Sequence, residues 1–305
     1  MLRDRLLSAS ILIAVIVALL VLDYRWPLGG ASGLWLMPLL LAFAFGTAID
    51  VTRLIAAAGL AVDRVAAIGG AALVAGAAYI PIVWPLFGDP YPADCPVGRT
   101  GWIVLAAAVA IFWVLVRQMA TYDSGRPGEA LARTLSGVFV SCYVGIPMAI
   151  LVVIRDLGDG SWGIAMLISV IAVAKSSDAG AYAVGKLCGR HRLIPRLSPG
   201  KTWEGAIGGI VVANLVSWGC LFGLIPWLAD VNESPPLWGP PLFGTALAVA
   251  AMVGDLAESL IKRESGAKDS GRTLPGLGGV WDVTDSLIAA VIPAWLALAA
   301  GVAGA

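Results

Sequence analysis

Long apolar runs separated by short polar segments make up most of the sequence. We count nine runs, each near the ~20 residues that an α-helix needs to cross the hydrocarbon core of a bilayer. Their expected bounds are 6–22, 33–49, 66–86, 101–116, 134–154, 162–184, 204–227, 241–261 and 285–304. The short alternating segments of an outer-membrane barrel are not found. The pattern predicts an all-α polytopic membrane protein with nine transmembrane helices.

The composition agrees with a membrane protein. Of the 305 residues, 59% are apolar and 13% are charged, whereas soluble domains carry roughly 25% charged residues. The net charge is zero, so no overall field would attract nucleic acid. The four cysteines show no CxxC spacing and His191 is the single histidine. The sequence therefore indicates neither a disulfide framework nor a histidine-rich metal site.

The distribution of Lys and Arg predicts the orientation. The first run lacks the small-residue cleavage site of a signal peptide, so we expect a retained first helix. With a cytoplasmic N-terminus, the inner segments hold sixteen of the twenty Lys and Arg residues, as the positive-inside rule requires. We therefore expect the loops 185–203 and 262–284 on the cytoplasmic side of the inner membrane.

Two parts of the chain differ in their polar content. Residues 1–130 carry few polar groups within the spans, and we expect them to form scaffold helices; whether 49–65 is an interfacial helix stays open. From residue 170 onward charges enter the spans, where they are costly and functional by default. We expect residues 131–305 to form the catalytic region, with cytoplasmic active-site loops.

The first two polar groups lie on the sixth run and in the loop after it. Lys175 and Asp178 are three residues apart, so they share a helical face, and a structural ion pair is an equal alternative to a functional role. The loop 185–205 is basic. It is either a topology signal and anionic-lipid contact or an anion site, because Ser198 to Thr202 directly precede an expected helix N-terminus.

Two further groups flank the loop before the last run. Asp255, Glu258, Ser259 and Lys262 fall on one helical face, where acids are suited to metal ligation or to a structural role. After the turn and the glycines Gly278 and Gly279 come Asp282 and Asp285, three residues apart, which project together if the segment is helical. Helix capping is the alternative use of these aspartates.

Together these groups place at least four carboxylates and several cations at one depth on one side of the membrane. Proteins hold Mg²⁺ with a few carboxylates and substrate phosphates. Lys and Arg neutralise the charge that develops in phosphoryl transfer. The sequence predicts a Mg²⁺-dependent enzyme that joins a cytoplasmic nucleotide or other polyphosphate to a membrane lipid.

Residues 259–285 resemble the signature of the phosphatidate cytidylyltransferases (CDP-diacylglycerol synthases). The matching residues are Ser259, Lys262, Arg263, Lys268, Asp269, Leu274, Pro275, Gly276, Gly278, Gly279, Asp282 and Asp285. Upstream segments around Asp178, Tyr182, Lys201 and Asp255 also look like family blocks, so the resemblance covers residues 170–290. Three positions depart from the family pattern, because Leu277, Val283 and Gly200 stand where His, Arg and Lys are usual.

The resemblance implies transfer of a cytidylyl group from CTP to phosphatidate, with Mg²⁺ and a second cation as an open addition. It implies no nucleic-acid partner and leaves a homodimer open. It assigns the metal to Asp255, Asp282, Asp285 and Asp178. It assigns catalysis to Asp255, Asp282, Lys262, Lys268 and Asp269. It assigns substrate binding to Lys201, Thr202, Ser198, Ser259, Arg263, Gly278, Gly279 and Tyr182.

Other functions stay open at this point. The departures at Leu277 and Val283 allow an inactive relative of the family. Charges within the spans also suit an ion-coupled transporter, although no clear internal repeat of the kind that transporters show is found. The dense aspartate motif of the CDP-alcohol phosphotransferases is not found either, which argues against that class of lipid enzyme.

Overall fold

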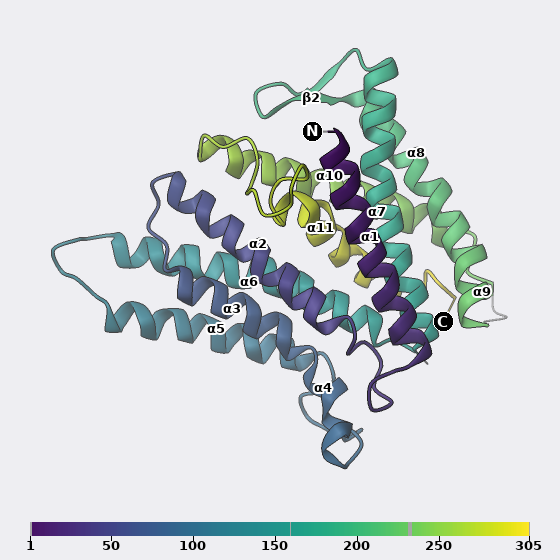
Figure 1. Cartoon of the computed structure of the whole chain (residues 1–305), viewed down its shortest axis with the longest axis horizontal. Coiled ribbons are helices and arrows are strands. Elements are labelled where there is room, and N and C mark those ends of the chain that lie inside the picture. Colours follow the sequence, from purple (N-terminus) through teal and green to yellow (C-terminus); the bar gives the residue numbers. More distant parts are fainter. Residues whose placement is uncertain (1, 159, 231–233, 305) are drawn as a thin grey trace. The chain divides into compact units, whose positions relative to one another are not determined.

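The computed structural model describes residues 2–158, 160–230 and 234–304, and the regular secondary structure of these residues is almost entirely helical (Figure 1). The helices are α1 (Leu2–Arg25), α2 (Met37–Ala57), α3 (Arg64–Ala77), α4 (Ile80–Val83), η1 (Trp84–Phe87), α5 (Gly101–Ala120), α6 (Glu129–Arg155), α7 (Ser161–Cys188), α8 (Trp203–Gly219), η2 (Cys220–Leu224), α9 (Ile225–Ala229), α10 (Gly239–Glu264) and α11 (Trp281–Ala299). The strands β1 (Arg192–Ile194) and β2 (Ser198–Thr202) pair as an antiparallel hairpin.

The helices confirm the predicted all-α polytopic fold. Within the described residues, eight helices are long and apolar enough to cross a membrane. A ninth crossing results if the bent pair Arg64–Ala77 and Ile80–Phe87 counts as one span. The expected single run at 66–86 is broken by 49° because α4 starts afresh with Pro81 in its first turn, and proline lacks the N–H that would continue the preceding helix.

Most helix boundaries differ by a few residues from the predicted ones, and two of these differences change the interpretation. Helix α2 continues to Ala57 instead of ending near residue 49, so an interfacial helix over 49–65 is wrong. Asp63 then begins α3 by accepting a hydrogen bond from Ala66 N at 3.1 Å. Helix α11 begins at Trp281, four residues earlier than predicted, so Asp282 and Asp285 both lie in its first turns.

The chain divides into two compact units. The first comprises Met1–Asp156 and Ile261–Thr284, and the second comprises Leu157–Leu260 and Asp285–Ala305. This division reflects which segments pack against one another and does not assign functions to them. The separate assignment of residues 1–130 as scaffold and 131–305 as the catalytic region stays a prediction.

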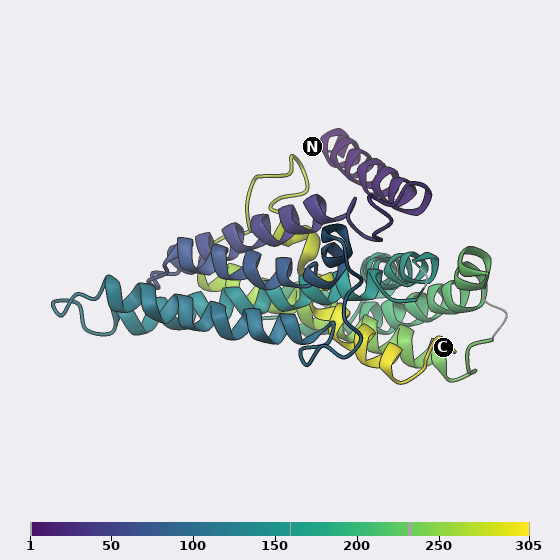
Figure 2. The ribbon, with the colours of Figure 1, turned by 90° about the horizontal axis from the view of Figure 1, so that it is seen from below.

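In the first unit, α2, α3, α5 and α6 lie side by side (Figure 2). Small residues allow α3 and α6 to approach closely. A Cβ atom on Gly145 would lie 2.7 Å from Val74 Cβ and 3.0 Å from Ala71 O. Helices in lipid gain little from the hydrophobic effect against one another, so close packing through small residues stabilises such pairs.

Ion pairs join helix ends of the first unit. The buried Asp23, near the end of α1, accepts hydrogen bonds from Arg155 Nε at 2.7 Å and Gly33 N at 2.9 Å. Arg117 Nε lies 2.9 Å from Asp63 Oδ2. Each pair joins residues that the predicted topology puts on the same side of the membrane. The direction of the chain across the membrane itself stays a prediction.

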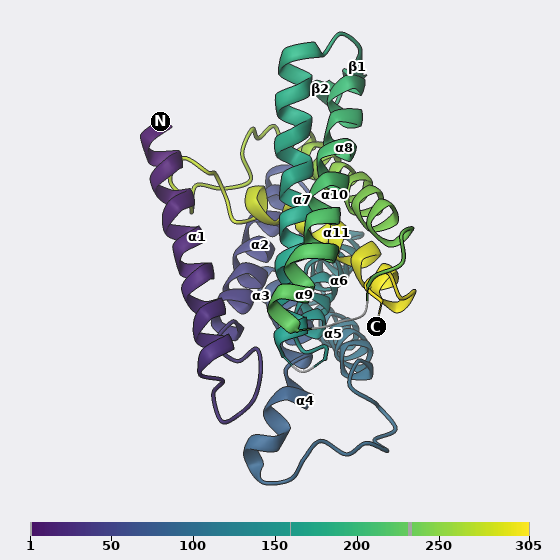
Figure 3. The ribbon, with the colours of Figure 1, turned by 90° about the vertical axis from the view of Figure 1, so that its right-hand side faces the viewer.

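In the second unit, α7 and α8 run alongside each other, and the β1–β2 hairpin connects them (Figure 3). A Cβ atom on Gly209 would lie 2.8 Å from Ser177 O, so glycine is needed for this approach. Thr202 ends the hairpin and starts α8, because its hydroxyl accepts a hydrogen bond from Gly205 N at 3.1 Å. The hairpin is therefore fixed to the N-terminus of α8 by an N-cap.

We expect Asp23→Ala to lower the free energy of unfolding by about 3–5 kcal/mol, because it leaves the guanidinium of Arg155 buried without its carboxylate. Thermal unfolding in detergent measures the change. Asp123→Ala is the matched control, since Asp123 and its partner Arg126 are 63% and 66% exposed and exposed pairs contribute little. Equal shifts for the two variants would contradict a stabilising role for the buried pair.

Candidate active site

Three carboxylates converge in the second unit. Asp255 and Glu258 come from α10 and Asp285 from α11, and one oxygen of each lies within 4.8 Å of the others. Glu258 and Asp285 are only 2% and 6% exposed. The helices meet here because α10 has a glycine at residue 254, where a Cβ atom would lie 2.5 Å from Asp285 O. Carboxylates so close repel one another unless a cation or a proton separates them.

Lys201 supplies one positive charge beside this cluster. Its Nζ lies 2.8 Å from Asp255 Oδ2 and donates a hydrogen bond to Met252 O at 3.3 Å. Strand β2 carries the lysine, and the Thr202 cap fixes the end of that strand against α8. The basic hairpin thus delivers a cation to the acidic face of α10.

Lys175 supplies a second positive charge from α7. Its Nζ lies 3.8 Å from Asp285 Oδ1 and 3.7 Å from Asp178 Oδ2, and it donates a hydrogen bond to Ser286 Oγ at 2.7 Å. The predicted pairing of Lys175 with Asp178 on one helical face is present, and Asp285 extends it. Two lysines therefore compensate three of the acids in this unit.

A cavity of about 380 Å³ occurs in the first unit and another of about 670 Å³ in the second. The larger one opens beside the acidic cluster and has charged and hydroxyl side chains in its wall. Its polar lining comprises Ser177, Asp178, Tyr182, Lys186, Arg192, Ser198, Lys201, Thr202 and Asp255. Four predicted substrate-binding residues, Ser198, Lys201, Thr202 and Tyr182, thus face one space. Its volume is of the size that small-molecule sites have.

Asp282 organises the loop of the first unit. Its Oδ2 accepts hydrogen bonds from Ser270 N at 2.9 Å, Ser270 Oγ at 2.7 Å and Gly279 N at 2.7 Å. Its Oδ1 lies 3.0 Å from Lys262 Nζ. Protein donors therefore engage both oxygens, and the metal role predicted for Asp282 stays a prediction.

The sequence reasoning missed Asp50. This residue of α2 is fully buried, and its Oδ2 accepts hydrogen bonds from Val280 N at 2.6 Å and Trp281 N at 3.2 Å. A carboxylate there satisfies N–H groups at the start of α11 and complements the positive end of the helix dipole. The signal was an acid at the end of an apolar run, in the part expected to act only as scaffold.

The remaining predicted residues are less enclosed. Arg263, Lys268 and Asp269 are exposed, and Asp269 lines the smaller cavity. Ser259 is half-buried on α10. Tyr182 is 70% exposed, with Lys186 Nζ 5.7 Å from the centre of its ring. Gly279 is packed so tightly that a Cβ atom would collide with Ser270 Oγ and the Asp50 carboxylate. The functional roles of these residues stay predictions.

Residues 3–300 match the model of the cytidylyltransferase family. The chain belongs to the cytidylyltransferase family. It is similar to the phosphatidate cytidylyltransferase of Brucella suis biovar 1, at 38% identity over 190 residues that make up 62% of this chain and 61% of that protein. It is also similar to the phosphatidate cytidylyltransferase of Mycobacterium bovis, at 33% identity over 236 residues, 74% of this chain and 69% of that protein.

The phosphatidate cytidylyltransferase of Haemophilus influenzae is 40% identical over 134 residues, 44% of this chain and 45% of that protein. The chain thus spans about three fifths of the length of the Brucella relative that it matches. For this cytidylyltransferase-family chain, the acidic cluster fits a divalent cation. It offers hard oxygen donors that are mostly buried and close enough to share one ion.

We expect Asp50→Ala to destabilise the start of α11, because two N–H groups lose a charged acceptor in a buried place. A loss of about 1–3 kcal/mol is expected for such unsatisfied donors. Thermal unfolding in detergent, with hydrogen exchange of residues 280–284, measures it. Asp89→Ala removes the same charge from an exposed loop, and an equally large effect there would contradict the capping role of Asp50.

Proposed function

We propose that this chain transfers the cytidylyl group of CTP to phosphatidate, giving CDP-diacylglycerol and pyrophosphate for phospholipid synthesis. The observation that carries the proposal is the cluster Asp255, Glu258 and Asp285 beside Lys175 and Lys201, at a polar cavity within apolar helices. Membership of the cytidylyltransferase family supports the nucleotidyl transfer. The names of the similar proteins support phosphatidate as the acceptor.

The reaction needs little acid–base chemistry from the protein. A phosphate oxygen of phosphatidate attacks the α-phosphorus of CTP, a new P–O bond forms, and the bond between the α-phosphorus and the bridging oxygen of pyrophosphate breaks. The attacking oxygen is already ionised at neutral pH, so no strong base is required. Catalysis then rests on positioning and on stabilising negative charge, as in other phosphoryl transfers.

The lysines of the second unit are suited to hold phosphate. Lys201 and Lys175 each contact a carboxylate, so a phosphate group would compete with Asp255 and Asp285 for these cations. Ser198 and Thr202 present hydroxyl groups to the same cavity. The resemblance to the family supports two further sets of roles. We propose substrate binding for Ser259 and Arg263, and catalysis for Lys262, Lys268 and Asp269.

Asp255, Glu258 and Asp285 are the residues we propose to hold Mg²⁺, with Asp178 in support. The chemistry that Mg²⁺ supplies when bound is Lewis-acid stabilisation of phosphate charge. Glu258 is an addition to the ligand set implied by the resemblance. It lies about one turn after Asp255 on α10 and is buried within the same cluster of carboxylates.

We place the protein in the inner membrane, with its active site facing the cytoplasm where CTP is found. The strong Lys and Arg bias of the inner loops supports this orientation. The apolar helices make it a multi-pass membrane protein.

Purified protein in detergent, given CTP and phosphatidate, should form CDP-diacylglycerol only with a divalent cation. A chain without turnover would be an inactive relative, and an ion-coupled transporter would act only in sealed vesicles.

We expect Asp255→Asn and Asp285→Asn each to lower turnover at least about 100-fold, because each removes one charge from a proposed metal site. The measurement is CDP-diacylglycerol formation over a range of Mg²⁺ concentrations. Glu264→Gln is the control on the same helix, since that acid is exposed at the end of α10. Wild-type turnover in either Asn variant at saturating Mg²⁺ would contradict the metal assignment.

Cys188 offers a test of orientation. It is exposed at the end of α7, in the loop region predicted to be cytoplasmic. In a variant that keeps only this cysteine, we expect a membrane-impermeant maleimide to label it after the cells are opened but not in intact cells. A second variant that keeps only Cys95, predicted outside, should be labelled in intact cells. The reverse pattern would overturn the topology.

A further inference from the structure

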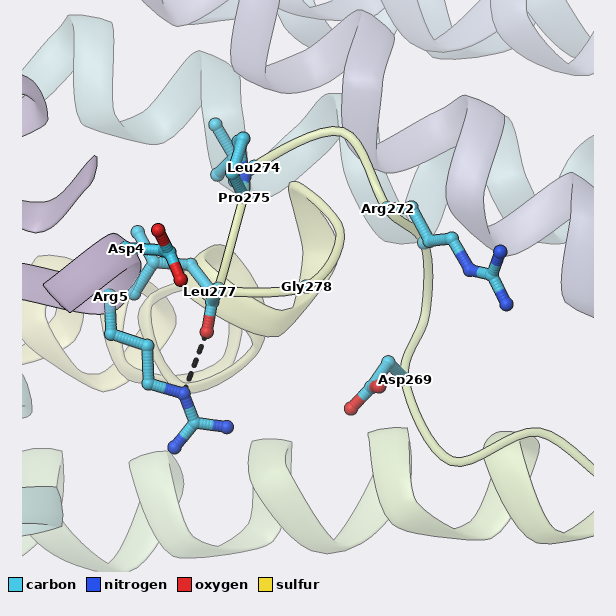
Figure 4. Close-up of a pocket in the computed structure, with 10 residues that line it drawn as sticks. Asp4, Arg5, Asp269, Arg272, Leu274, Pro275, Leu277 and Gly278 are labelled. Atoms are coloured by element: carbon cyan, nitrogen blue, oxygen red, sulfur yellow. Dashed lines mark hydrogen bonds between the residues drawn. The ribbon is translucent and has the colours of Figure 1, made fainter. Parts of the chain in front are cut away.

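The tip of the loop between α10 and α11 is held by the first helix of the chain. Arg5 Nε donates a hydrogen bond to Gly276 O at 2.8 Å, and Figure 4 shows this contact as a dashed line. Ser8 Oγ donates to Pro275 O at 2.7 Å. Successive carbonyls of one turn thus accept hydrogen bonds from side chains one helical turn apart on α1. We call Arg5 and Ser8 the clamp.

The turn that the clamp holds is closed by its own backbone. Leu274 N donates to Gly278 O at 2.9 Å, and Gly278 N donates to Leu274 O at 3.0 Å. Gly276 has φ +78°, and a Cβ atom there would lie 2.7 Å from Arg5 N. The turn therefore needs glycine both for its conformation and for its approach to α1.

The clamp lies at the edge of an open cavity. A cavity of about 380 Å³ lies between the first turn of α1 and the loop, and Asp4, Arg5, Asp269, Arg272 and Leu277 line it. Figure 4 shows these side chains around the open space. Side-chain packing around the tip is thus incomplete, and the two hydrogen bonds to α1, together with the close approach of Gly276 to the Arg5 backbone, hold the tip in place.

The base of the same loop is fixed by Asp282. This carboxylate binds Ser270 N at one end of the loop and Gly279 N at the other, and Lys262 at its second oxygen. The loop is thus a ring with an anchor at its base and the clamp at its tip. Ser270 and Gly279 lie six and three residues from Gly276, so short stretches of backbone connect the tip to the contacts at Asp282.

Helix α1 is held mainly at its ends. Only 6% of its most apolar stretch is buried, so its middle contributes little packing. Near its other end, the buried Asp23 pairs with Arg155. These contacts fix the position of α1 and let its N-terminal turns act as a support for the loop.

We propose that Arg5 and Ser8 are positioning residues, which hold the signature loop so that Lys262, Ser270 and Asp282 keep the arrangement used in turnover. They act through the backbone of Pro275 and Gly276 and do not touch substrate. The link to turnover rests on the proposed function. The existence of the clamp does not, and the two can be measured separately.

Hydrogen exchange of residues 270–280 in detergent tests the clamp directly. In Arg5→Ala with Ser8→Ala we expect the turn amides to exchange about tenfold faster, because local opening becomes easier when its hydrogen bonds are lost. Arg3→Ala with Ser10→Ala is the matched control. It removes the same groups from the same turns, at exposed side chains that form no hydrogen bond or ion pair with the described residues. Unchanged exchange in the clamp variant would overturn the proposal.

Turnover tests the positioning role. In the clamp variant we expect kcat to fall about tenfold, while the KM for CTP changes less than about twofold. The unfolding temperature should equal that of the control variant. Ser8→Thr keeps the hydroxyl and should restore most of the Ser8→Ala loss. Faster exchange with unchanged kcat would overturn the positioning role. Absence of turnover in the wild-type chain would instead sink the proposed function, and the exchange measurement would still decide whether the clamp exists.

Discussion

A carboxylate among apolar helices must find its solvation within the protein, because the hydrocarbon around it offers none. Three acids of the first unit meet this constraint with backbone N–H groups, and each also lies near a side-chain cation, which is Arg155 for Asp23, Arg53 for Asp50 and Lys262 for Asp282. Asp23 accepts hydrogen bonds from Gly33 and Arg155, and Asp50 accepts them from the first N–H groups of α11. Asp282 accepts hydrogen bonds from both ends of the loop and pairs with Lys262. Each acid thereby fixes a segment that its own helix does not contain. The architecture of the polar loop depends on these few enclosed charges.

The second unit handles the same constraint differently. Asp255, Glu258 and Asp285 are brought together, and the lysines contact two of them from α7 and from β2. Such an arrangement holds three carboxylate oxygens within 4.8 Å of one another beside a polar cavity. This explains why the cluster suits a bound cation, whereas Asp23 and Asp50 of the first unit serve as structural acceptors.

The sequence predicted the helical class, the approximate spans and the faces that carry Lys175 with Asp178 and Asp255 with Glu258, because these follow from local periodicity. It did not predict the bend before Pro81 or the extension of α2 to Ala57, since helix ends depend on tertiary contacts. Asp50 and Ser286 were missed for the same reason, because their partners are distant in sequence. The structure also explains how the turn tolerates Leu277 in place of the usual His. Backbone hydrogen bonds close the turn, and the side chain at position 277 does not contribute to them.

The limited packing of α1 places different demands on the residues of its middle and on the residues near its ends. Ile11, Ile13, Val15 and Val17 are 42–60% exposed along its lipid-facing length, where any apolar side chain of similar size satisfies the surroundings. Near its ends, Arg5, Ser8 and Asp23 make directional hydrogen bonds that few other residue types can reproduce. The middle of the helix therefore tolerates many apolar substitutions, while the hydrogen bonds at its two ends restrain its length. Insertion or deletion of even one residue would rotate one end by about 100° relative to the other and break the register between the two anchors.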